Sequence, residues 1–252
     1  MGTGFSYAID NILLTDMDQA AEEFVTFLDN LYKMYPSFVG KPLYLTGESY
    51  AGKYIPAFSK RILDLDPQRY NLKAALIGDP FVAPVAQKTL MYVVPEALNV
   101  LDASNMSQIA TLNRRCEEIL NTDIDIAYTT CNDIMDEYIS KVSGGAYPYD
   151  YRIYDYDWTP LETPVTGYLT QSNKVNELYA AIHVQNSTKE PIFEMSSKRV
   201  SAAFNKDKII DYTSYYQELV DRDFPLLVYA GEFDALDGPV SQNAWIKRLR
   251  FE

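Results

Sequence analysis

The chain of 252 residues lacks any apolar run of the roughly 18 residues that a transmembrane helix needs. Its N-terminus also lacks a basic stretch followed by an apolar one, so it predicts no signal peptide. Hydrophobic residues nevertheless make up 47% of the sequence, which is enough for a large buried core. The length predicts one globular domain, or one domain with an insertion.

Basic residues are scarce, with 22 Lys and Arg against 35 Asp and Glu. The resulting net charge of −13 disfavours nucleic acid and anionic membranes as partners. The acidic excess fits an acidic compartment, where fewer carboxylates are ionised. A solvated acidic surface explains the same excess equally well.

Cysteine is scarce too, and only Cys116 and Cys131 are present. Two cysteines are too few for a disulfide scaffold or a four-ligand zinc site. They form either one bridge or two buried thiols, and no cluster of residues indicates a metal or an organic cofactor. Two N-x-[ST] triplets, at Asn105 and Asn186, are candidates for glycosylation and weakly support secretion.

The spacing of apolar residues predicts an alternation of helices and strands. A helix, a buried strand, a second helix and a second strand follow one another, which is typical of an α/β fold with a parallel sheet. Helical patterns, a tyrosine-rich stretch and a late buried strand come next. In chain order, the predicted helices are 16–35, 50–65, several within 85–142, 173–182, 208–221 and 239–250, the strands are 42–46, 73–78 and 226–230, and the tyrosine-rich loop is 144–160.

One serine stands in an unusual setting, in the stretch "LYLTGESYAGKYIP" at residues 43–56. The sequence G-E-S-Y-A around Ser49 lies between a predicted strand and a predicted helix, which is the context of a nucleophile elbow, G-x-S-x-G. Ala51 takes the last place. Such a turn lifts the hydroxyl above the sheet and points the helix N-terminus and the Tyr50 amide toward an oxyanion. The alternative is that Ser49 is the N-cap of the helix.

A serine nucleophile needs a base, normally a histidine held by a carboxylate. On this architecture the chain order is serine, acid, histidine. Asp234 follows a buried strand in "LLVYAGEFDALDG" and is the first candidate for the acid, with Asp237 second, although both residues also suit a turn. The only histidine, His183, precedes the acid in an apolar helical stretch, which favours a structural role.

Together these motifs resemble the serine carboxypeptidase family of α/β-hydrolases. The family's nucleophile signature matches "LTGESYAGKYIP" nearly letter for letter, and its "IGNG" segment resembles "ALIGDPFVAP". Similar segments recur in the family's order in "GTGFSYA" at residues 2–8, "YLTQSNKVNELYAAIHV" and "LLVYAGEFD". The tract "AIHVQNST" favours the vitellogenic-like carboxypeptidase branch.

The resemblance implies a central, mostly parallel sheet with flanking helices and a helical cap insertion. Residues 1–83 and 167–252 would form the two parts of the hydrolase core, and residues 84–166 the insertion. By position, Ser49 is the nucleophile and Asp234 the acid. The resemblance also implies the Tyr50 amide as an oxyanion donor, Glu48 as a binder of the substrate's terminal carboxylate through a shared proton, and a disulfide between Cys116 and Cys131.

Two parts of the family pattern have no match in the chain: an "NGGPGCSS"-type segment before "GTGFSY", and a catalytic histidine after the aspartate. We therefore expect a hydrolase fold truncated at both ends, without the base, half of the oxyanion hole and half of the carboxylate clamp. Partner chains or missing segments would then cover the open sheet edges.

Three functional hypotheses follow. The chain is a serine carboxypeptidase that releases C-terminal residues from peptides through an acyl-enzyme on Ser49. Alternatively it is an inactive relative that acts as a structural or binding subunit of a larger assembly. A serine esterase or acyltransferase on the same fold is a third reading. The family resemblance implies a lysosomal, vacuolar or secreted location and no cofactor.

Overall fold

The computed structural model describes residues 2–6, 12–120, 122–154, 164, 167–169 and 193–251. The chain divides into two compact units, one of residues 16–155 and 206–252 and one of residues 1–15 and 156–205. In the smaller unit, Gly4 and Glu194 form an antiparallel bridge. The larger unit contains the sheet and every candidate site residue that the structure describes.

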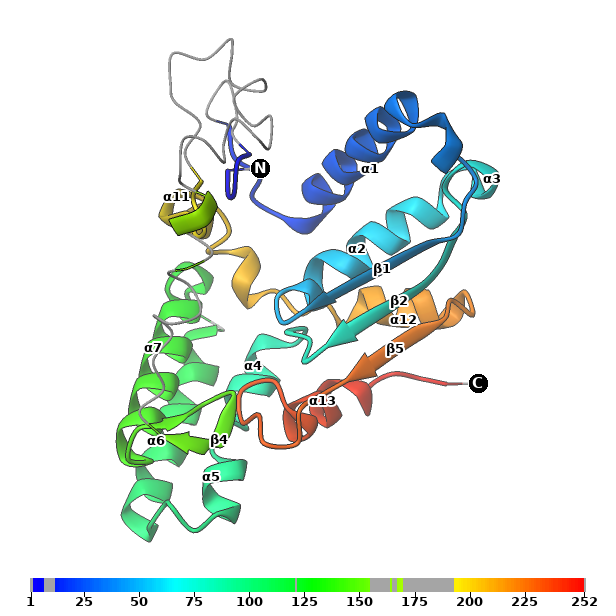
Figure 1. The fold of residues 1–252 in the computed structure, drawn as a ribbon. Helices are drawn as coiled ribbons and strands as arrows, with labels where there is room; N and C mark the ends of the chain where they lie inside the picture. The colour runs from blue at the N-terminus through cyan, green and yellow to red at the C-terminus, as the bar shows by residue number, and fades with distance from the viewer. Residues whose placement is uncertain are drawn as a thin grey trace. The chain divides into compact units, whose positions relative to one another are not determined.

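Three parallel strands form the sheet of the larger unit, in the order β1, β2, β5 (Figure 1). β2 lies in the centre, and its Ala75 and Ile77 are fully buried. Because the strands are parallel, all three end at the same edge of the sheet, where ligand sites of α/β folds lie. This arrangement confirms the predicted α/β fold. The strands are β1 (Leu43–Glu48), β2 (Leu72–Gly78) and β5 (Leu226–Tyr229).

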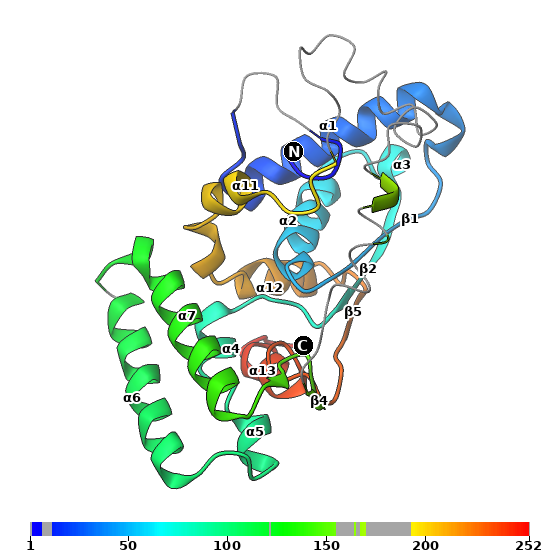
Figure 2. The same cartoon turned by 60° about the vertical axis from the view of Figure 1, so that its left-hand side comes forward.

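Helix α2 packs on the sheet, and α1 and α12 pack on α2, so that all three lie on one side of the strands (Figures 1 and 2). Pro56 lies inside α2 and has no N–H to donate to Gly52. The buried hydroxyl of Tyr216 on α12 donates to the Gly52 carbonyl instead, at 2.9 Å. The helices are α1 (Met17–Met34), α2 (Ala51–Leu63) and α12 (Thr213–Asp221).

Helix α1 begins and ends where the sequence predicts. The Asp16 carboxylate caps it by accepting from the Gln19 amide at 2.8 Å, and the helix stops before Pro36. The helical spacing of Phe24, Phe27, Leu28 and Leu31 in the sequence predicts one buried stripe, but Phe27 is 56% exposed. The stripe that is buried is Met17, Ala21, Val25, Leu28 and Tyr32.

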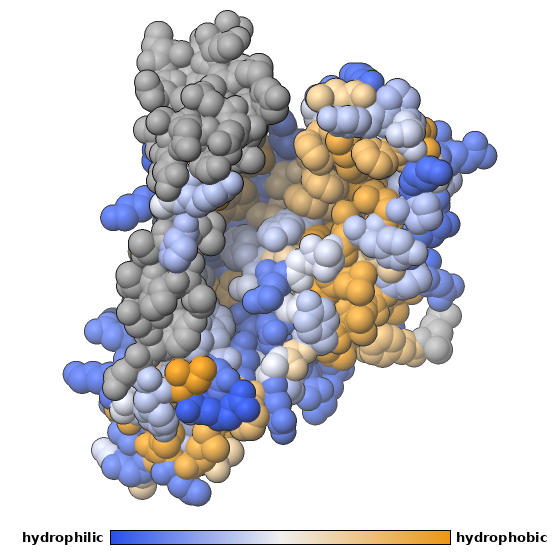
Figure 3. Space-filling view, in the orientation of Figure 1, coloured by the Kyte–Doolittle hydropathy of each residue, from blue (hydrophilic) through white to orange (hydrophobic). Residues whose placement is uncertain are grey.

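The other face of the sheet is uncovered by the described residues. Tyr44 on β1 and Leu227 and Tyr229 on β5 are each at least half exposed. Apolar residues gather over this region of the larger unit (Figure 3). Parallel sheets are normally covered on both faces, so this face is a surface that a further element would bury.

A helical hairpin of α6 and α7 follows the first two strands. Cys116 on α6 and Cys131 on α7 form a disulfide with Cα atoms 4.9 Å apart, which confirms the predicted bridge. The described part of the tyrosine-rich stretch, predicted as a loop, forms an antiparallel strand pair from Ala146 to Tyr154. The elements are α6 (Ala103–Leu120), α7 (Ile124–Val142), β3 (Ala146–Tyr147) and β4 (Asp150–Tyr154).

The remaining predicted elements differ at their ends. The helix predicted from residue 208 begins at Thr213, after a short 3-10 turn, and the last helix ends at Ile246. The predicted helix 173–182 lies outside the described residues, and the division at 83/84 and 166/167 stays a prediction. The other elements are η1 (Pro36–Phe38), α3 (Pro67–Tyr70), α4 (Pro84–Lys88), α5 (Val93–Ala97), α11 (Lys198–Ala203), η2 (Asp207–Ile209) and α13 (Pro239–Ile246).

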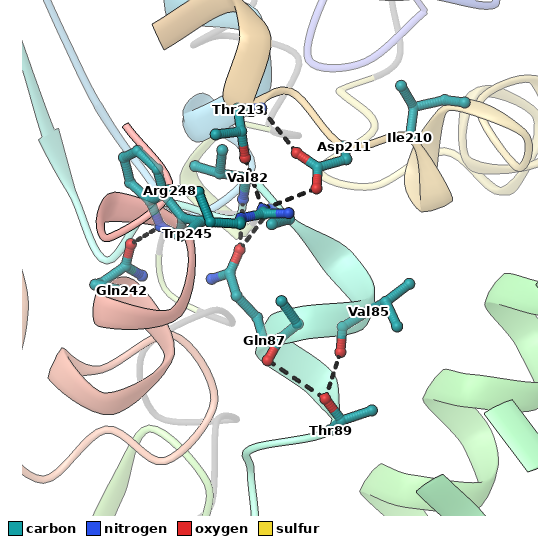
Figure 4. A network of polar contacts seen from close by, with 12 residues as sticks. Val82, Val85, Gln87, Thr89, Ile210, Asp211, Thr213, Gln242, Trp245 and Arg248 are labelled. Atoms are coloured by element: carbon teal, nitrogen blue, oxygen red, sulfur yellow. Dashed lines mark hydrogen bonds and ion pairs between the residues drawn. The ribbon is translucent and has the colours of Figure 1, made fainter. Parts of the chain in front are cut away.

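A buried polar network joins α4 and α13 to the loop after β2 (Figure 4). The Gln87 amide accepts from the Val82 N–H at 2.7 Å and donates to the Pro80 carbonyl at 2.9 Å. Gln242 donates to the same carbonyl at 3.0 Å and accepts from the Trp245 indole at 2.7 Å. Because these buried groups are mutually satisfied, they fix the loop that borders the candidate site.

Candidate active site

Ser49 is the single residue between the end of β1 and the N-cap of α2. Its φ is +58°, the left-handed conformation that side chains other than glycine, Asn and Asp rarely adopt. Tyr50 occupies the N-cap position with helical backbone angles. The alternative reading of Ser49 as the N-cap is therefore wrong, and the sharp turn matches the geometry of a nucleophile elbow.

Backbone hydrogen bonds hold this turn on both sides of Ser49. Its N–H donates to the Gly78 carbonyl at the end of β2, at 3.0 Å. Its carbonyl accepts from the Gly52 amide at 2.9 Å and from the Phe81 amide at 2.8 Å. Both backbone groups of the strained residue are thus satisfied, and they tie it to the neighbouring strand.

Two glycines make the close approach of strand and helix possible. A Cβ on Gly47 would lie 2.6 Å from the Ala51 Cβ. A Cβ on Gly52 would lie 2.7 Å from the Phe81 backbone nitrogen, where nothing flexible can yield. The sequence G-x-S-x-A-G therefore has a steric cause at each of these positions.

The loop after β5 carries Asp234, which is only 6% exposed. Its Oδ1 accepts from the amides of Leu236 and Asp237, at 2.7 and 2.9 Å. Two backbone donors to one oxygen fix the carboxyl group in the loop.

Asp237, the second candidate acid, lies in a different environment. Its Oδ1 accepts from the Gln87 side-chain amide at 3.0 Å, in the network that joins α4 and α13. This residue is 3% exposed. Asp237 is therefore a buried member of the polar network of α4 and α13.

Asp79, at the end of β2, is a member of the site that the sequence analysis missed. It adopts a φ of +40°, and its Oδ1 accepts from the Gly231 amide at 2.8 Å. This bond ties the loop after β2 to the loop that carries Asp234. An Asp directly after the glycine of a buried strand, before a proline, is the signal that could have indicated a special turn.

The carboxyl groups at this edge of the sheet influence one another. Burial raises the pKa of Asp234 to about 6, against the two backbone hydrogen bonds, and the charges of Asp79 and Glu48 raise it further. Burial also raises the pKa of Asp79, and Glu48 adds to that effect. Glu48 itself is exposed at the end of β1. Carboxyl groups are therefore concentrated at this edge of the sheet, and their mutual repulsion favours the protonated forms of Asp234 and Asp79.

The strand order brings these residues together. Ser49 follows β1, Asp79 follows β2 and Asp234 follows β5, and neighbouring strands in a sheet lie about 4.8 Å apart. Ser49 and Asp234 thus follow strands separated by one intervening strand, at the same sheet edge.

The other candidate residues lie away from this edge or outside the described residues. Asn105 lies in the first turn of α6, where its side chain and that of Asp102 cap each other's amides, at 3.0 and 2.8 Å. His183 and Asn186 lie outside the residues that the structure describes. Within the described ranges, no group of three or more His, Cys, Asp or Glu side chains is placed to hold a metal ion. None of the described helices is long and apolar enough to cross a membrane.

Comparison with known protein families shows to which family the chain belongs. The family model described as "Serine carboxypeptidase" matches residues 1–252. The chain belongs to the serine carboxypeptidase family. Pheromone-processing carboxypeptidases of fungi are among its relatives: 27% identity over 100% of the chain for the protein of Aspergillus terreus, and 28% over 99% for that of Phaeosphaeria nodorum.

The chain spans 42% and 41% of the lengths of these two relatives. A solved structure of Kex1(delta)p, a prohormone-processing carboxypeptidase from Saccharomyces cerevisiae, matches 95% of the chain and 54% of its own chain. The TM-score is 0.77 at 21% sequence identity. This likeness confirms the predicted α/β-hydrolase fold for this member of the serine carboxypeptidase family.

Proposed function

We propose that the chain carries the nucleophile and acid of a serine carboxypeptidase, with Ser49 as the nucleophile and Asp234 as the acid. The single observation that carries this proposal is the left-handed φ of +58° at Ser49, between a buried parallel strand and a helix. A strained serine at such a junction is the expected signature of an exposed nucleophile. Peptide C-termini are the proposed substrates.

In the proposed reaction the Ser49 Oγ attacks the carbonyl carbon of the last peptide bond and its proton passes to a base. The Tyr50 amide donates to the oxyanion of the tetrahedral intermediate. The carbon–nitrogen bond then breaks, the base returns the proton to the leaving amine, and water hydrolyses the acyl-enzyme. The base is a histidine in this chemistry, and the one histidine of the sequence, His183, lies outside the described residues.

Asp234 would hold that base and balance its charge. A positively charged imidazole beside the Asp234 carboxyl would lower its raised pKa, since an opposite charge favours the ionised form. The two backbone bonds to Oδ1 leave the other oxygen of Asp234 for this contact.

Glu48 would bind the terminal carboxylate of the peptide. Two carboxyl groups attract each other only when they share a proton, so this role predicts tighter substrate binding in acid. A Glu48→Gln variant should therefore show a Michaelis constant that varies less with pH than that of the wild type.

A serine-directed fluorophosphonate tests the proposal directly. The wild-type protein should be labelled, and Ser49→Ala should lose the label while keeping its fold. Ser104→Ala, at an exposed position on α6, is the matched control and should label normally. A folded wild-type protein that takes up no label would contradict the proposal.

A second candidate function is that of a non-catalytic subunit in a larger assembly. The uncovered sheet face around Tyr44, Leu227 and Tyr229 favours it, because a partner chain or a further segment would bury this surface. Stable binding of a partner without fluorophosphonate labelling would support this function over the first.

An oxidising compartment of the secretory or vacuolar route is the proposed location. The disulfide between Cys116 and Cys131 supports it, because such bridges persist mainly outside reducing compartments. Glycosylation at Asn105 or Asn186 would follow from this location, and a mass shift on treatment with an N-glycosidase tests it.

A further inference from the structure

The hydrogen-bond ladder between β2 and β5 continues past the ends of the two strands. The last residues in register are Gly78 and Tyr229. The Asp79 N–H then donates to the Tyr229 carbonyl at 2.8 Å, which is the next bond that a parallel ladder makes. The bond after that would join the Gly231 N–H to the Asp79 backbone carbonyl. The Asp79 side chain takes this bond instead, since its Oδ1 accepts from the Gly231 N–H at 2.8 Å.

The left-handed conformation of Asp79 explains why its side chain takes this bond. At a φ of +40° the chain leaves the extended conformation and turns away from β5. Two residues later it reaches the elbow, where the Phe81 N–H donates to the Ser49 carbonyl at 2.8 Å. The Gly78 carbonyl, just before the turn, accepts from the Ser49 N–H at 3.0 Å. The turn at Asp79 therefore holds the nucleophile elbow by its backbone and the acid loop by its side chain.

Gly231 is the first residue of the turn that carries Asp234. The Asp234 N–H donates to the Gly231 carbonyl at 3.2 Å, so a change in the orientation of Gly231 is passed on to the acid. A glycine has no side chain to restrict its backbone, and the Asp79 carboxylate supplies the restraint from outside the loop. Other bonds hold the middle and the end of the loop: the Tyr151 N–H to the Phe233 carbonyl, and the Gln87 side-chain amide to Asp237.

The same bond brings two acidic side chains to Gly231. A Cβ on this glycine would lie 3.9 Å from the Asp79 Oδ1 and 3.9 Å from the Asp234 Cβ. Burial raises the pKa of Asp234 most, and the negative charge of Asp79 raises it further. The carboxylate that anchors the loop therefore also acts on the acid that the loop carries.

The other charged groups around Asp234 are placed differently. Glu48 at the end of β1 and Glu232 in the loop are exposed, and Asp237 is bonded into the network of α4 and α13. Arg152 of β4 lies over the ring of the loop residue before Asp234, but its guanidinium is paired with a carboxylate of β4 at 2.7 Å. Asp79 is thus the acidic neighbour that a backbone donor of the acid loop fixes in place.

We propose that Asp79 is a positioning residue for the reaction: its carboxylate fixes the base of the acid loop beside the nucleophile elbow, and its negative charge sets the acid limit of the activity. This inference rests on the proposed function, in which Ser49 is the nucleophile and Asp234 holds the base. The charge acts in one direction, because a nearby negative charge raises the pKa of Asp234 and of any imidazole that it holds.

The test compares Asp79→Asn with Asp79→Ala. The asparagine keeps an oxygen that accepts from the Gly231 N–H but loses the charge, and the alanine loses both. Asp223→Ala is the matched control, because Asp223 has a similar φ of +53° and lies before β5, at its opposite end from the acid loop. Both alanine variants thus carry the same backbone strain. The measurement is the maximal rate of fluorophosphonate labelling from about pH 4 to about pH 8.

Asp79→Ala should lower the maximal rate about tenfold more than Asp223→Ala does, because the acid is no longer held in place. Asp79→Asn should label at least about fivefold faster than Asp79→Ala, since it keeps the anchor. In both Asp79 variants the acid limit should move lower by about half a pH unit, because removing a negative charge disfavours the protonated forms of the acid and the base. Asp223→Ala should leave the acid limit where the wild type has it.

An acid limit of Asp79→Asn equal to that of the wild type would overturn the proposal, and so would equal maximal rates of Asp79→Ala and Asp223→Ala. If the wild type takes up no label, the proposed function fails and NMR decides this inference by itself. The Asp234 carboxyl carbon should then titrate at a lower pH in Asp79→Asn than in the wild type. The Leu236 and Asp237 amides, which donate to Asp234, should exchange faster in Asp79→Ala than in Asp223→Ala. Equal titration or equal exchange overturns the proposal.

Discussion

Five described residues other than glycine adopt a positive φ, and four of them are Asn or Asp: Asn71, Asp79, Asn99 and Asp223. Their short polar side chains tolerate the left-handed region. Ser49 is the exception, with the same backbone conformation and no such advantage. Its strain persists because Gly78, Phe81 and Gly52 bind both its backbone groups. Strain retained at one residue in this way is what the proposed role of Ser49 as the nucleophile predicts.

The strain at Ser49 is measurable as a difference between two variants. Ser49→Gly should be more stable than Ser49→Ala by about 1 kcal/mol, because glycine adopts a positive φ without steric cost. Urea denaturation of both variants gives this difference. Equal stabilities, or a more stable alanine variant, would show that the turn carries no strain.

The raised pKa of Asp234 predicts how the stability of the fold depends on pH. Its pKa of about 6 in the folded protein lies above the ordinary 3.8, so between these values the folded state binds more protons than the unfolded state. Stability should therefore rise as pH falls from 7 to 4, by up to about 3 kcal/mol. Urea denaturation across this range measures it.

Asp234→Asn should remove most of this pH dependence, since the amide does not titrate. A smaller dependence of the same sign should remain, because burial also raises the pKa of Asp79. An unchanged pH dependence in the variant would mean that Asp234 is ionised in the folded chain at acid pH.

At the scale of elements, local features of the sequence predicted where the helices and strands around the candidate site lie. The capping Asp16 and the stop at Pro36 fix the ends of α1, and small residues fix the junction of β1 and α2. The strand pair β3–β4 was missed because its tyrosines alternate with turn-forming residues, and pairing across a sheet is not a local property. Two backbone bonds join this hairpin to the acid loop: the Tyr151 N–H of β4 donates to the Phe233 carbonyl, and the Ala235 N–H donates to the carbonyl of Pro148 in the turn.

The disulfide stabilises the hairpin of α6 and α7, and both of its cysteines are buried. Because 15 positions separate them, the chain-entropy model assigns the bridge about 3 kcal/mol. A variant with both Cys116→Ala and Cys131→Ala should lose about this much stability in urea denaturation. Dithiothreitol should destabilise the wild type similarly and leave the variant unchanged; a wild type indifferent to the reductant would contradict the role of the bridge.

At the scale of the whole molecule, the three-stranded sheet of the larger unit has helices on one face and exposed side chains on the other. A parallel sheet buries both faces in a stable fold. Among the residues that the structure describes, none covers the face that carries Tyr44, Leu227 and Tyr229, so this face is a surface that a further element would bury.

Substitutions on the exposed face of the sheet and in the helices on its other side should differ in their cost to stability. Leu227→Lys, at a position 52% exposed, should change stability by less than about 0.5 kcal/mol and should reduce self-association measured by sedimentation. Leu219→Lys, at a fully buried position, should cost more than about 3 kcal/mol. A comparable loss for both would show that Leu227 is covered within the chain itself.

The sequence by itself determined the family, the α/β order of elements, the elbow at Ser49 and the cysteine pair, because spacing, small residues and short motifs are local properties. Only the tertiary structure decided that Asp79 borders the acid loop and that Asp207 lies behind Tyr50. These contacts join residues about 150 positions apart, and a carboxylate in a loop looks the same in sequence wherever it folds. The physical reason is that burial and partner choice arise from packing, which no local pattern encodes.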